Sequence, residues 1–142
     1  MFTITEYLTE EHRECDRLYS EVEELVREEK WEKAQSAFKT FKEETLKHFQ
    51  REEDVLFPDF EARTGIVMGP TRVMRMEHAQ ARDLMEKMEE ALLKKDKKSF
   101  NQLGETFMIL IQQHNLKEEQ ILYPMCDQHL DPVEEVQKMQ SL

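Results

Sequence analysis

The sequence predicts an all-α fold, and three observations support this prediction. Only 3 Gly and 4 Pro interrupt the 142 residues. Glu, Lys, Gln, Leu and Met, which are good helix formers, dominate the stretches between these interruptions. Apolar positions recur at alternating steps of four and three, the spacing of a helix with one buried face. A chain of this length suffices for one domain with a sizeable core and is too short for two.

Turn signals divide the chain into four long helices. A charged break at Glu29-Lys30, a segment at 63–70 that ends in Pro70, and the run KKDKK at 94–98 separate the helix-forming stretches. We therefore expect helices at about residues 5–29, 31–62, 70–94 and 97–129. Short connections between helices of this length favour an up-down-up-down four-helix bundle.

The last residues are expected to form a separate short element. Asp131-Pro132 resembles an N-cap followed by the first position of a helix. We therefore divide the chain into a bundle domain of residues 1–130 and a short C-terminal helix or tail of residues 131–142.

Two of the long helices carry polar residues on the face that their spacing predicts to be buried. The two stripes are Ala34, Phe38, Phe41, Thr45, His48, Glu52, Val55 and Phe100, Gly104, Phe107, Ile111, His114, Glu118, Ile121. The other two helices contribute His12 and His78 to their own apolar stripes. Each helix therefore places a histidine where a core residue is expected.

The chain is an internal repeat of two helical hairpins. A shift of 66 residues aligns the two halves without a gap. It pairs Glu11-His12 with Glu77-His78, His48 with His114, Glu52-Glu53 with Glu118-Glu119, and Phe57-Pro58 with Tyr123-Pro124. A unit of this length exceeds that of most solenoid repeats, so two related hairpins in one bundle explain the pattern better.

The repeated polar residues are expected at one level of the bundle. The two histidines of each hairpin are equally far from its turn, about 27 Å away at a rise of 1.5 Å per residue. Because residues four apart share a helix face, the glutamates four positions after His48 and His114 also point inwards. The converging side chains are His12, His48, Glu52, His78, His114 and Glu118.

A bound cation explains why these polar side chains share a buried position. Burying two unpaired carboxylates would cost several kcal/mol each, and the imidazoles would still need partners. Core histidines and ion pairs on helix faces are the simpler explanation for any single residue, but they leave the repeated arrangement unexplained. Mixed imidazole and carboxylate ligands suit iron or manganese. Two histidines per metal with both glutamates shared would leave open positions, which favours a reactive two-metal centre.

The order of these residues resembles that of the hemerythrin-like, or HHE cation-binding, family. That pattern is a histidine in the first helix, HxxxE in the second, EH in the third and HxxxE in the fourth, and the likeness covers roughly residues 5–130. The extensions EExxLFP and EExxLYP make it specific. The resemblance implies a non-haem centre of two iron ions, oxo- or hydroxo-bridged, with Glu52 and Glu118 as bridging ligands. Manganese is the alternative metal.

The chain departs from the oxygen-carrying hemerythrins at Met74, where those proteins have a further histidine one turn before His78. Because a missing ligand leaves room for a substrate, we expect binding of or reaction with O2, nitric oxide or peroxide, in oxygen or nitric oxide handling, sensing or stress defence. Redox catalysis, by peroxide decomposition, nitric oxide reduction or ferroxidase chemistry, is a second hypothesis. Iron delivery or iron–sulfur repair is a third, and a metal-free interaction bundle is a fourth.

Composition argues against several classes of partner. A net charge of -11 disfavours binding to nucleic acid and to anionic membrane surfaces. The longest apolar run, FMILI at 107–111, is too short to span a bilayer, and the first residues lack the layout of a signal peptide. Cys15 and Cys126 form no CxxC pair, so a cytoplasmic protein is expected. The sequence identifies no protein partner.

Four kinds of residue near the predicted site receive simpler interpretations. His129 lies about three turns beyond the last predicted ligand and is expected at the surface. Cys15 and Tyr19 are expected to pack in the core. Glu53 and Glu119 repeat as faithfully as the ligands, but a neighbouring residue on a helix points about 100° away. We therefore assign these two to the surface or to contacts with the ligands, and not to the metal.

Overall fold

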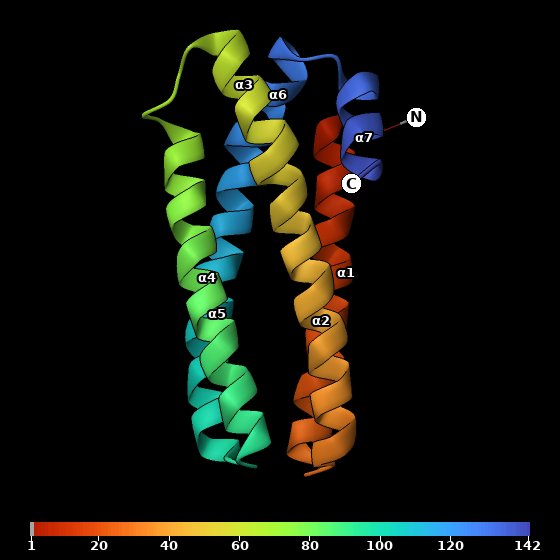
Figure 1. Cartoon of the computed structure of the whole chain (residues 1–142), viewed down its shortest axis with the longest axis vertical. Helices are drawn as coiled ribbons and strands as arrows, with labels where there is room; N and C mark the ends of the chain where they lie inside the picture. Colours follow the sequence, from red (N-terminus) through yellow and green to blue (C-terminus); the bar gives the residue numbers. More distant parts are fainter. Residues whose placement is uncertain (1) are drawn as a thin grey trace.

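The computed structural model describes residues 2–142, and helices form nearly all of that part of the chain (Figure 1). The elements are α1 Ile4–Arg27, α2 Trp31–Arg51, η1 Glu52–Leu56, α3 Phe57–Thr64, α4 Pro70–Leu93, α5 Lys97–Lys117, η2 Glu118–Leu122, α6 Tyr123–His129 and α7 Pro132–Gln140. Figure 1 shows the turns after α1 and α4 at one end of the bundle and the α3–α4 connection at the other. The predicted all-α bundle is confirmed.

The helices begin and end where the sequence offers caps. Thr3 and Glu6 form a capping box at the start of α1, with the Thr3 hydroxyl accepting from the Glu6 backbone at 3.0 Å. Asp96 caps α5, and Asp131 caps α7 as predicted. Gly65 ends α3 with a φ of 75°, a conformation in which glycine is not strained.

The two hairpin turns share a backbone conformation as well as a sequence position. Glu29 follows α1 with a φ of 57°, and Lys95 follows α4 with a φ of 54°. The 66-residue shift pairs these two residues. Because such values are uncommon outside glycine, their recurrence shows that the repeat extends to the backbone of the turns.

A wider π-helical turn interrupts each of the two helical runs that carry HxxxE. The turns η1 and η2 begin at Glu52 and Glu118, and the amides of Phe57 and Tyr123 donate to the carbonyls five residues earlier. In both runs a proline follows one residue later, lacking an amide hydrogen and crowding the carbonyl four residues before it. A wider turn relieves this crowding, and π-turns inside helices occur mostly at functional sites.

The π-turns change which residues face the core. Uninterrupted α-helical spacing predicts burial of Val55 and Ile121, but Val55 is half-buried and Ile121 is 56% exposed. An i→i+5 turn adds one residue to the repeat, so the buried face moves to later positions. The buried residues there are Leu56, Phe57, Leu122 and Tyr123. The prediction for Val55 and Ile121 was wrong because it assumed one helical period throughout.

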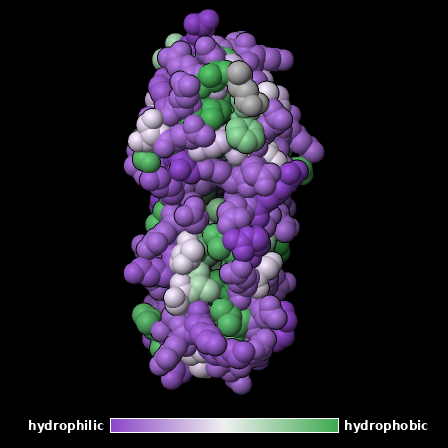
Figure 2. All heavy atoms as spheres, turned by 90° about the vertical axis from the view of Figure 1, so that its right-hand side faces the viewer, coloured by the Kyte–Doolittle hydropathy of each residue, from purple (hydrophilic) through white to green (hydrophobic). Residues whose placement is uncertain are grey.

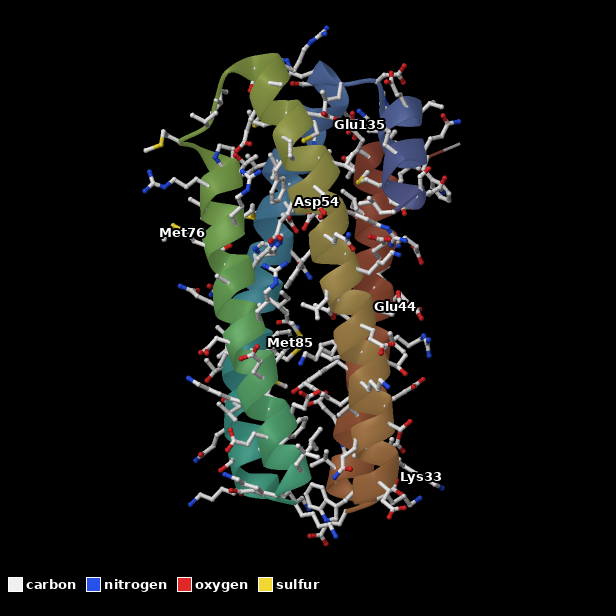
Figure 3. The ribbon with its side chains drawn as sticks, viewed as in Figure 1. Lys33, Glu44, Asp54, Met76, Met85 and Glu135 are labelled. Atoms are coloured by element: carbon white, nitrogen blue, oxygen red, sulfur yellow. The ribbon has the colours of Figure 1, made fainter. Side chains whose placement is uncertain are left out.

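The apolar core consists of two clusters with a polar layer between them. The lower cluster, near the hairpin turns, includes Tyr19 and Met85. Met76, which lies on the same helix as Met85, points away from the bundle (Figure 3). The upper cluster contains Ile4, Leu8, Leu56, Phe57, Phe60, Met74, Leu122, Tyr123, Cys126, Val136 and Met139. The last two belong to α7, so the C-terminal helix packs on the bundle. The domain division at residue 130 stays a prediction.

The surface is consistent with the charge of the chain. Figure 2 shows mostly hydrophilic side chains over the face that lies on the right in Figure 1. Among residues 2–142, no helix combines the length and the apolar character needed to cross a membrane.

Candidate metal centre

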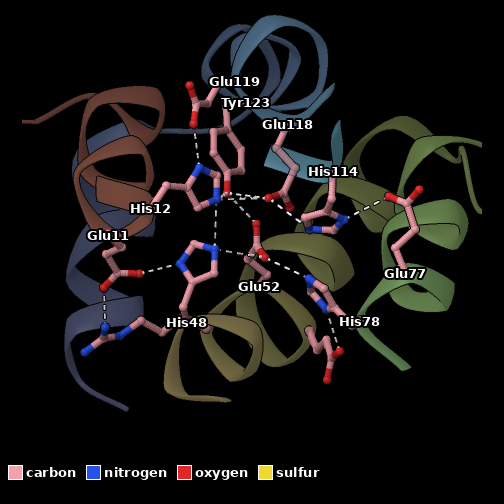
Figure 4. A network of polar contacts seen from close by, with 12 residues as sticks. Glu11, His12, His48, Glu52, Glu77, His78, His114, Glu118, Glu119 and Tyr123 are labelled. Atoms are coloured by element: carbon pink, nitrogen blue, oxygen red, sulfur yellow. Dashed lines mark hydrogen bonds and ion pairs between the residues drawn. The ribbon is translucent and has the colours of Figure 1, made fainter. Parts of the chain in front are cut away.

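The six predicted polar residues meet in the layer between the two apolar clusters (Figure 4). The structure brings them from six different elements, and each is at most 4% exposed. They are His12 of α1, His48 of α2, Glu52 of η1, His78 of α4, His114 of α5 and Glu118 of η2. Two of the elements are the π-turns, which begin at the two glutamates.

One half of the cluster contains His12, His48 and Glu118. The Nε2 atom of His12 lies 3.1 Å from Nε2 of His48 and 3.1 Å from Oε1 of Glu118. These three residues can each offer one ligand atom within 4.8 Å of the others. The imidazole rings of His12 and His48 meet edge to face, with centroids 4.7 Å apart.

The other half contains Glu52, His78, His114 and Glu118, whose ligand atoms also lie within 4.8 Å of one another. Nε2 of His78 is 3.1 Å from Oε1 of Glu52, and Nε2 of His114 is 3.1 Å from Oε1 of Glu118. Glu118 therefore belongs to both halves. The arrangement agrees with two histidines per half, as the repeat predicts.

Several of these buried atoms form no hydrogen bond, although they lie close to one another. They are Oε1 of Glu52, Nε2 of His78, Nε2 of His114 and Oε2 of Glu118. Each unsatisfied buried group costs about 1–3 kcal/mol, and more when it is charged. A cation accepts lone pairs from all four atoms at once, so the donor set fits a metal better than it fits the protein alone.

Each histidine is held from behind by a glutamate bonded to Nδ1 (Figure 4). The pairs are His12 with Glu119 (2.7 Å), His48 with Glu11 (2.8 Å), His78 with Glu53 (2.6 Å) and His114 with Glu77 (2.9 Å). With Nδ1 engaged, Nε2 of each ring is directed to the centre. Carboxylate–histidine pairs of this kind typically support metal ligands.

Comparison with known families agrees with this geometry. The family model of the hemerythrin HHE cation binding domain matches residues 3–126. The chain belongs to this family. No curated protein and no solved structure matches the chain. Family membership and the buried His/Glu cluster together support cation binding.

Two of the glutamates behind the histidines of this hemerythrin-family protein were missed from the sequence. Glu53 and Glu119, assigned to the surface or to contacts with the ligands, do contact the histidines. Glu11 and Glu77 were noted only as parts of the repeated motifs and were given no role, although they recur at the same 66-residue shift as His12 and His78. Their exact recurrence beside a histidine was the available signal.

Three of these glutamates also bond to the side chain of an arginine or lysine. Arg51 bonds to Glu11, Lys117 to Glu77 at 2.5 Å, and Arg82 to Glu53 at 2.8 and 2.9 Å. Within residues 2–142, Glu119 forms no ion pair with a lysine or arginine. The repeat places Asp16 where the other half has Arg82, so the two halves of the hemerythrin centre are not electrostatically equal.

A tyrosine that the sequence pattern did not indicate as a site residue completes the polar layer. The Tyr123 hydroxyl donates to Oε2 of Glu52 at 2.6 Å, and lies 3.0 Å from Oε1 of Glu118 and 3.1 Å from Nε2 of His12. Burial and the two carboxylates raise the pKa of Tyr123 well above its usual value. The signal for it was the replacement of Phe57 by tyrosine in the second repeat.

The pKa shifts in the polar layer show that it favours positive charge. Burial and the neighbouring Glu118 raise the pKa of Glu52. Burial acts on Glu118 as well, but its neighbours, His114 foremost, hold its pKa well below the usual value. Burial disfavours charge on His12 and His78, yet their carboxylate partners outweigh it and raise the two pKa values to about 10 and about 9. The buried carboxylates therefore require positive charge beside them, which a proton or a metal ion can supply.

A small cavity adjoins the His12 and His48 half on the side of the lower apolar cluster. Its volume is about 20 Å³, enough for one particle the size of water. Its lining includes Cys15 and Tyr19, which pack against the lower cluster as predicted. His129 is exposed, also as predicted.

Proposed function

We propose that this up-down-up-down bundle is a non-haem two-iron protein that binds or reacts with O2, nitric oxide or peroxide. The proposed ligands are His12, His48, Glu52, His78, His114 and Glu118. The observation that carries the proposal is the buried cluster of ligand atoms, arranged as two halves that share Glu118. Four of these atoms, all in the half with His78 and His114, have no hydrogen-bond partner. Manganese would suit the same atoms and is the alternative metal.

In this proposal, the residues of the chain bind the metal ions, orient the imidazole ligands and exclude water. The glutamates at each Nδ1 hold the imidazole rings, so that Nε2 meets a cation without rearrangement. Glu52 and Glu118 extend between the halves, and the apolar clusters above and below keep bulk water out. When bound, iron would supply the change of oxidation state and the open position for a small ligand.

The enclosure of the centre supports a small ligand. The neighbouring cavity of about 20 Å³ has space for one particle the size of water, so it excludes metabolites of ordinary size. The net charge of -11 disfavours nucleic acid and anionic membrane surfaces as partners. We further propose a cytoplasmic location, which the free thiols of Cys15 and Cys126 support.

Redox catalysis on the same ligands is the second candidate. The observation that favours it is Met74, which is buried in the upper apolar cluster and offers no nitrogen to the centre. One fewer ligand leaves a position where a substrate can react. Sustained turnover of peroxide or nitric oxide by the iron-loaded protein would favour catalysis, whereas a single stoichiometric binding event would favour carriage or sensing.

Metal analysis after anaerobic loading with Fe(II) tests the proposal. We expect about two iron ions per chain in the unchanged protein, and at most about one in His114→Ala, because this change removes an Nε2 ligand. His129→Ala is the matched control, since it removes an exposed histidine from the same helical run and should retain both ions. An unchanged protein that retains no iron, or a His114→Ala variant that retains two ions, would contradict the assignment.

A further inference from the structure

The two halves of the centre differ at one buried ring. The 66-residue repeat pairs Phe57 with Tyr123, and neither is exposed at all. The Phe57 ring stacks on His78 with centroids 5.8 Å apart, and the Tyr123 ring stacks on His12 with centroids 5.7 Å apart. The two rings therefore occupy equivalent places, and the second half adds a hydroxyl group to the shared architecture.

That hydroxyl lies among the ligand atoms and not outside them. It is 2.6 Å from Glu52, 3.0 Å from Glu118 and 3.1 Å from Nε2 of His12. Two ligand atoms on one metal, each at about 2.1 Å and at right angles, are about 3 Å apart. The spacing of the hydroxyl from its neighbours therefore matches the spacing among the histidine and glutamate ligand atoms themselves.

We propose that the phenol oxygen of Tyr123 is a seventh protein ligand, bound to the cation that His12 and His48 hold. This inference rests on the proposed two-metal function and makes the two halves chemically unequal. The half with His12 gains an oxygen ligand, whereas Phe57 brings only carbon to the half with His78. An anionic oxygen favours a ferric over a ferrous ion, so the half with His12 is the more easily oxidised one.

Coordination requires the phenol to lose its proton. The O–H bond breaks, the oxygen lone pair forms the bond to the cation, and the proton leaves to the solvent without any transfer of electrons. In the structure the hydroxyl donates to Glu52 and faces a second carboxylate on Glu118. A bound cation reverses the sign of the local charge that keeps the phenol neutral there.

Spectra of the ferric protein test this assignment. The unchanged protein, Tyr123→Phe and Tyr19→Phe are loaded anaerobically with Fe(II), their iron content is measured, and ferricyanide then oxidises the iron. We expect a phenolate-to-Fe(III) band in the visible spectrum, with tyrosinate ring modes in resonance Raman, for the unchanged protein and for Tyr19→Phe. Both signals should disappear in Tyr123→Phe when the spectra are compared per bound iron.

The control variant removes the hydroxyl of another buried tyrosine, which lies away from the proposed ligand atoms. The Tyr19 hydroxyl lies against Gly104, where an added Cβ would approach it to 2.2 Å. A chain with Tyr7 and Tyr19 both changed to Phe keeps Tyr123 as its single tyrosine among the 3 in the sequence. Retention of the tyrosinate modes in this chain would support the assignment even if Tyr123→Phe failed to fold.

The outcomes separate this inference from the proposed function. Two bound ions without tyrosinate modes in the unchanged protein, or modes that persist in Tyr123→Phe, would overturn the role of Tyr123 and leave the two-iron proposal standing. Failure of the unchanged protein to bind iron at all would overturn both.

Discussion

Each histidine proposed as a ligand is the innermost member of a short chain of polar contacts. His114 donates from Nδ1 to Glu77, and Lys117 donates to the other oxygen of the same carboxylate. The glutamate fixes the ring and makes it a stronger ligand. Lys117 is 44% exposed, so its ion pair with Glu77 is screened by solvent and adds little stability. The carboxylate is therefore the member of the chain that matters for the metal.

Replacement of Glu77 by Gln should weaken metal binding without unfolding the protein. The amide cannot accept from Nδ1 with the strength of a carboxylate, so we expect a loss of about 10–100-fold in metal affinity. Glu90→Gln is the matched control on the same helix, because Glu90 forms an exposed ion pair with Lys94. Competition with a chelator measures the affinity, and circular dichroism checks the helix content. Equal affinities of the two variants would show that Glu77 does not support the ligand.

Among the helices, α1 and α5 approach each other where one of them has a glycine. A Cβ atom at Gly104 of α5 would lie 2.2 Å from the hydroxyl and 3.5 Å from Cζ of Tyr19 on α1. The glycine therefore makes room for the hydroxyl and not for the ring. Tyr19 in turn packs its ring against Phe41 and Phe107, with centroids 5.3 and 6.1 Å away.

Gly104→Ala should destabilise the protein even though alanine is the better helix former. The overlap with the Tyr19 hydroxyl is expected to cost about 1–3 kcal/mol. In a Tyr19→Phe background the same change should instead stabilise by up to about 1 kcal/mol, because the helix propensity of alanine then prevails. Urea unfolding of the four chains gives the coupling energy. The same cost of Gly104→Ala in both backgrounds would refute the contact.

In the molecule as a whole, the polar layer lies between the two apolar clusters. The lower cluster is built by the long helices, whereas the upper one also needs α7, which contributes Val136 and Met139. The same helix buries Glu135, whose Oε2 has no hydrogen-bond partner. Burial and the adjacent Asp59 raise the pKa of Glu135 to about 7, against the nearby Lys138, which lowers it. The helix α7, which packs on the upper cluster, thus carries a carboxyl group, that of Glu135, whose protonated form is favoured by its surroundings.

The packing of α7 should therefore weaken as the pH rises. The folded chain holds the Glu135 proton up to about pH 7, whereas the unfolded group loses it near 4.5, so the free energy of unfolding falls across this interval. Asp59 has a lowered pKa, so its own contribution is lost only at lower pH, below this interval. The two effects can thus be distinguished by pH.

Glu135→Gln should remove this dependence. Urea unfolding of the metal-free variant and of the metal-free unchanged protein at pH 5 and pH 8 measures this effect. The free energy of unfolding of the variant, relative to that of the unchanged protein, should be higher at pH 8 than at pH 5. Glu134→Gln, an exposed neighbour on α7, should show no such difference. An equal effect of Glu135→Gln at both pH values would argue against a raised pKa.

Much of the candidate site was predictable, and the limits have physical causes. The repeat and helical spacing identified His12, His48, His78 and His114 as inward-facing. This was possible because the spacing of apolar residues along a helix shows which of its faces is buried. The later positions Val55 and Ile121 were mispredicted because a π-turn resets that direction. The role of Tyr123 was missed because its ring follows the π-turn, where α-helical counting no longer holds.

The residue pattern was sufficient for the all-α class, the two-hairpin repeat, and the residues that gather in the polar layer, because these depend on composition and on periodicity along one chain. The three-dimensional packing settled which glutamate supports which histidine: Glu53 reaches His78 and Glu119 reaches His12, each from another helix. It also brought the Tyr123 hydroxyl to the ligand atoms. Such contacts depend on how neighbouring helices are rotated and shifted along their axes relative to one another. The residue pattern of a single helix does not determine this.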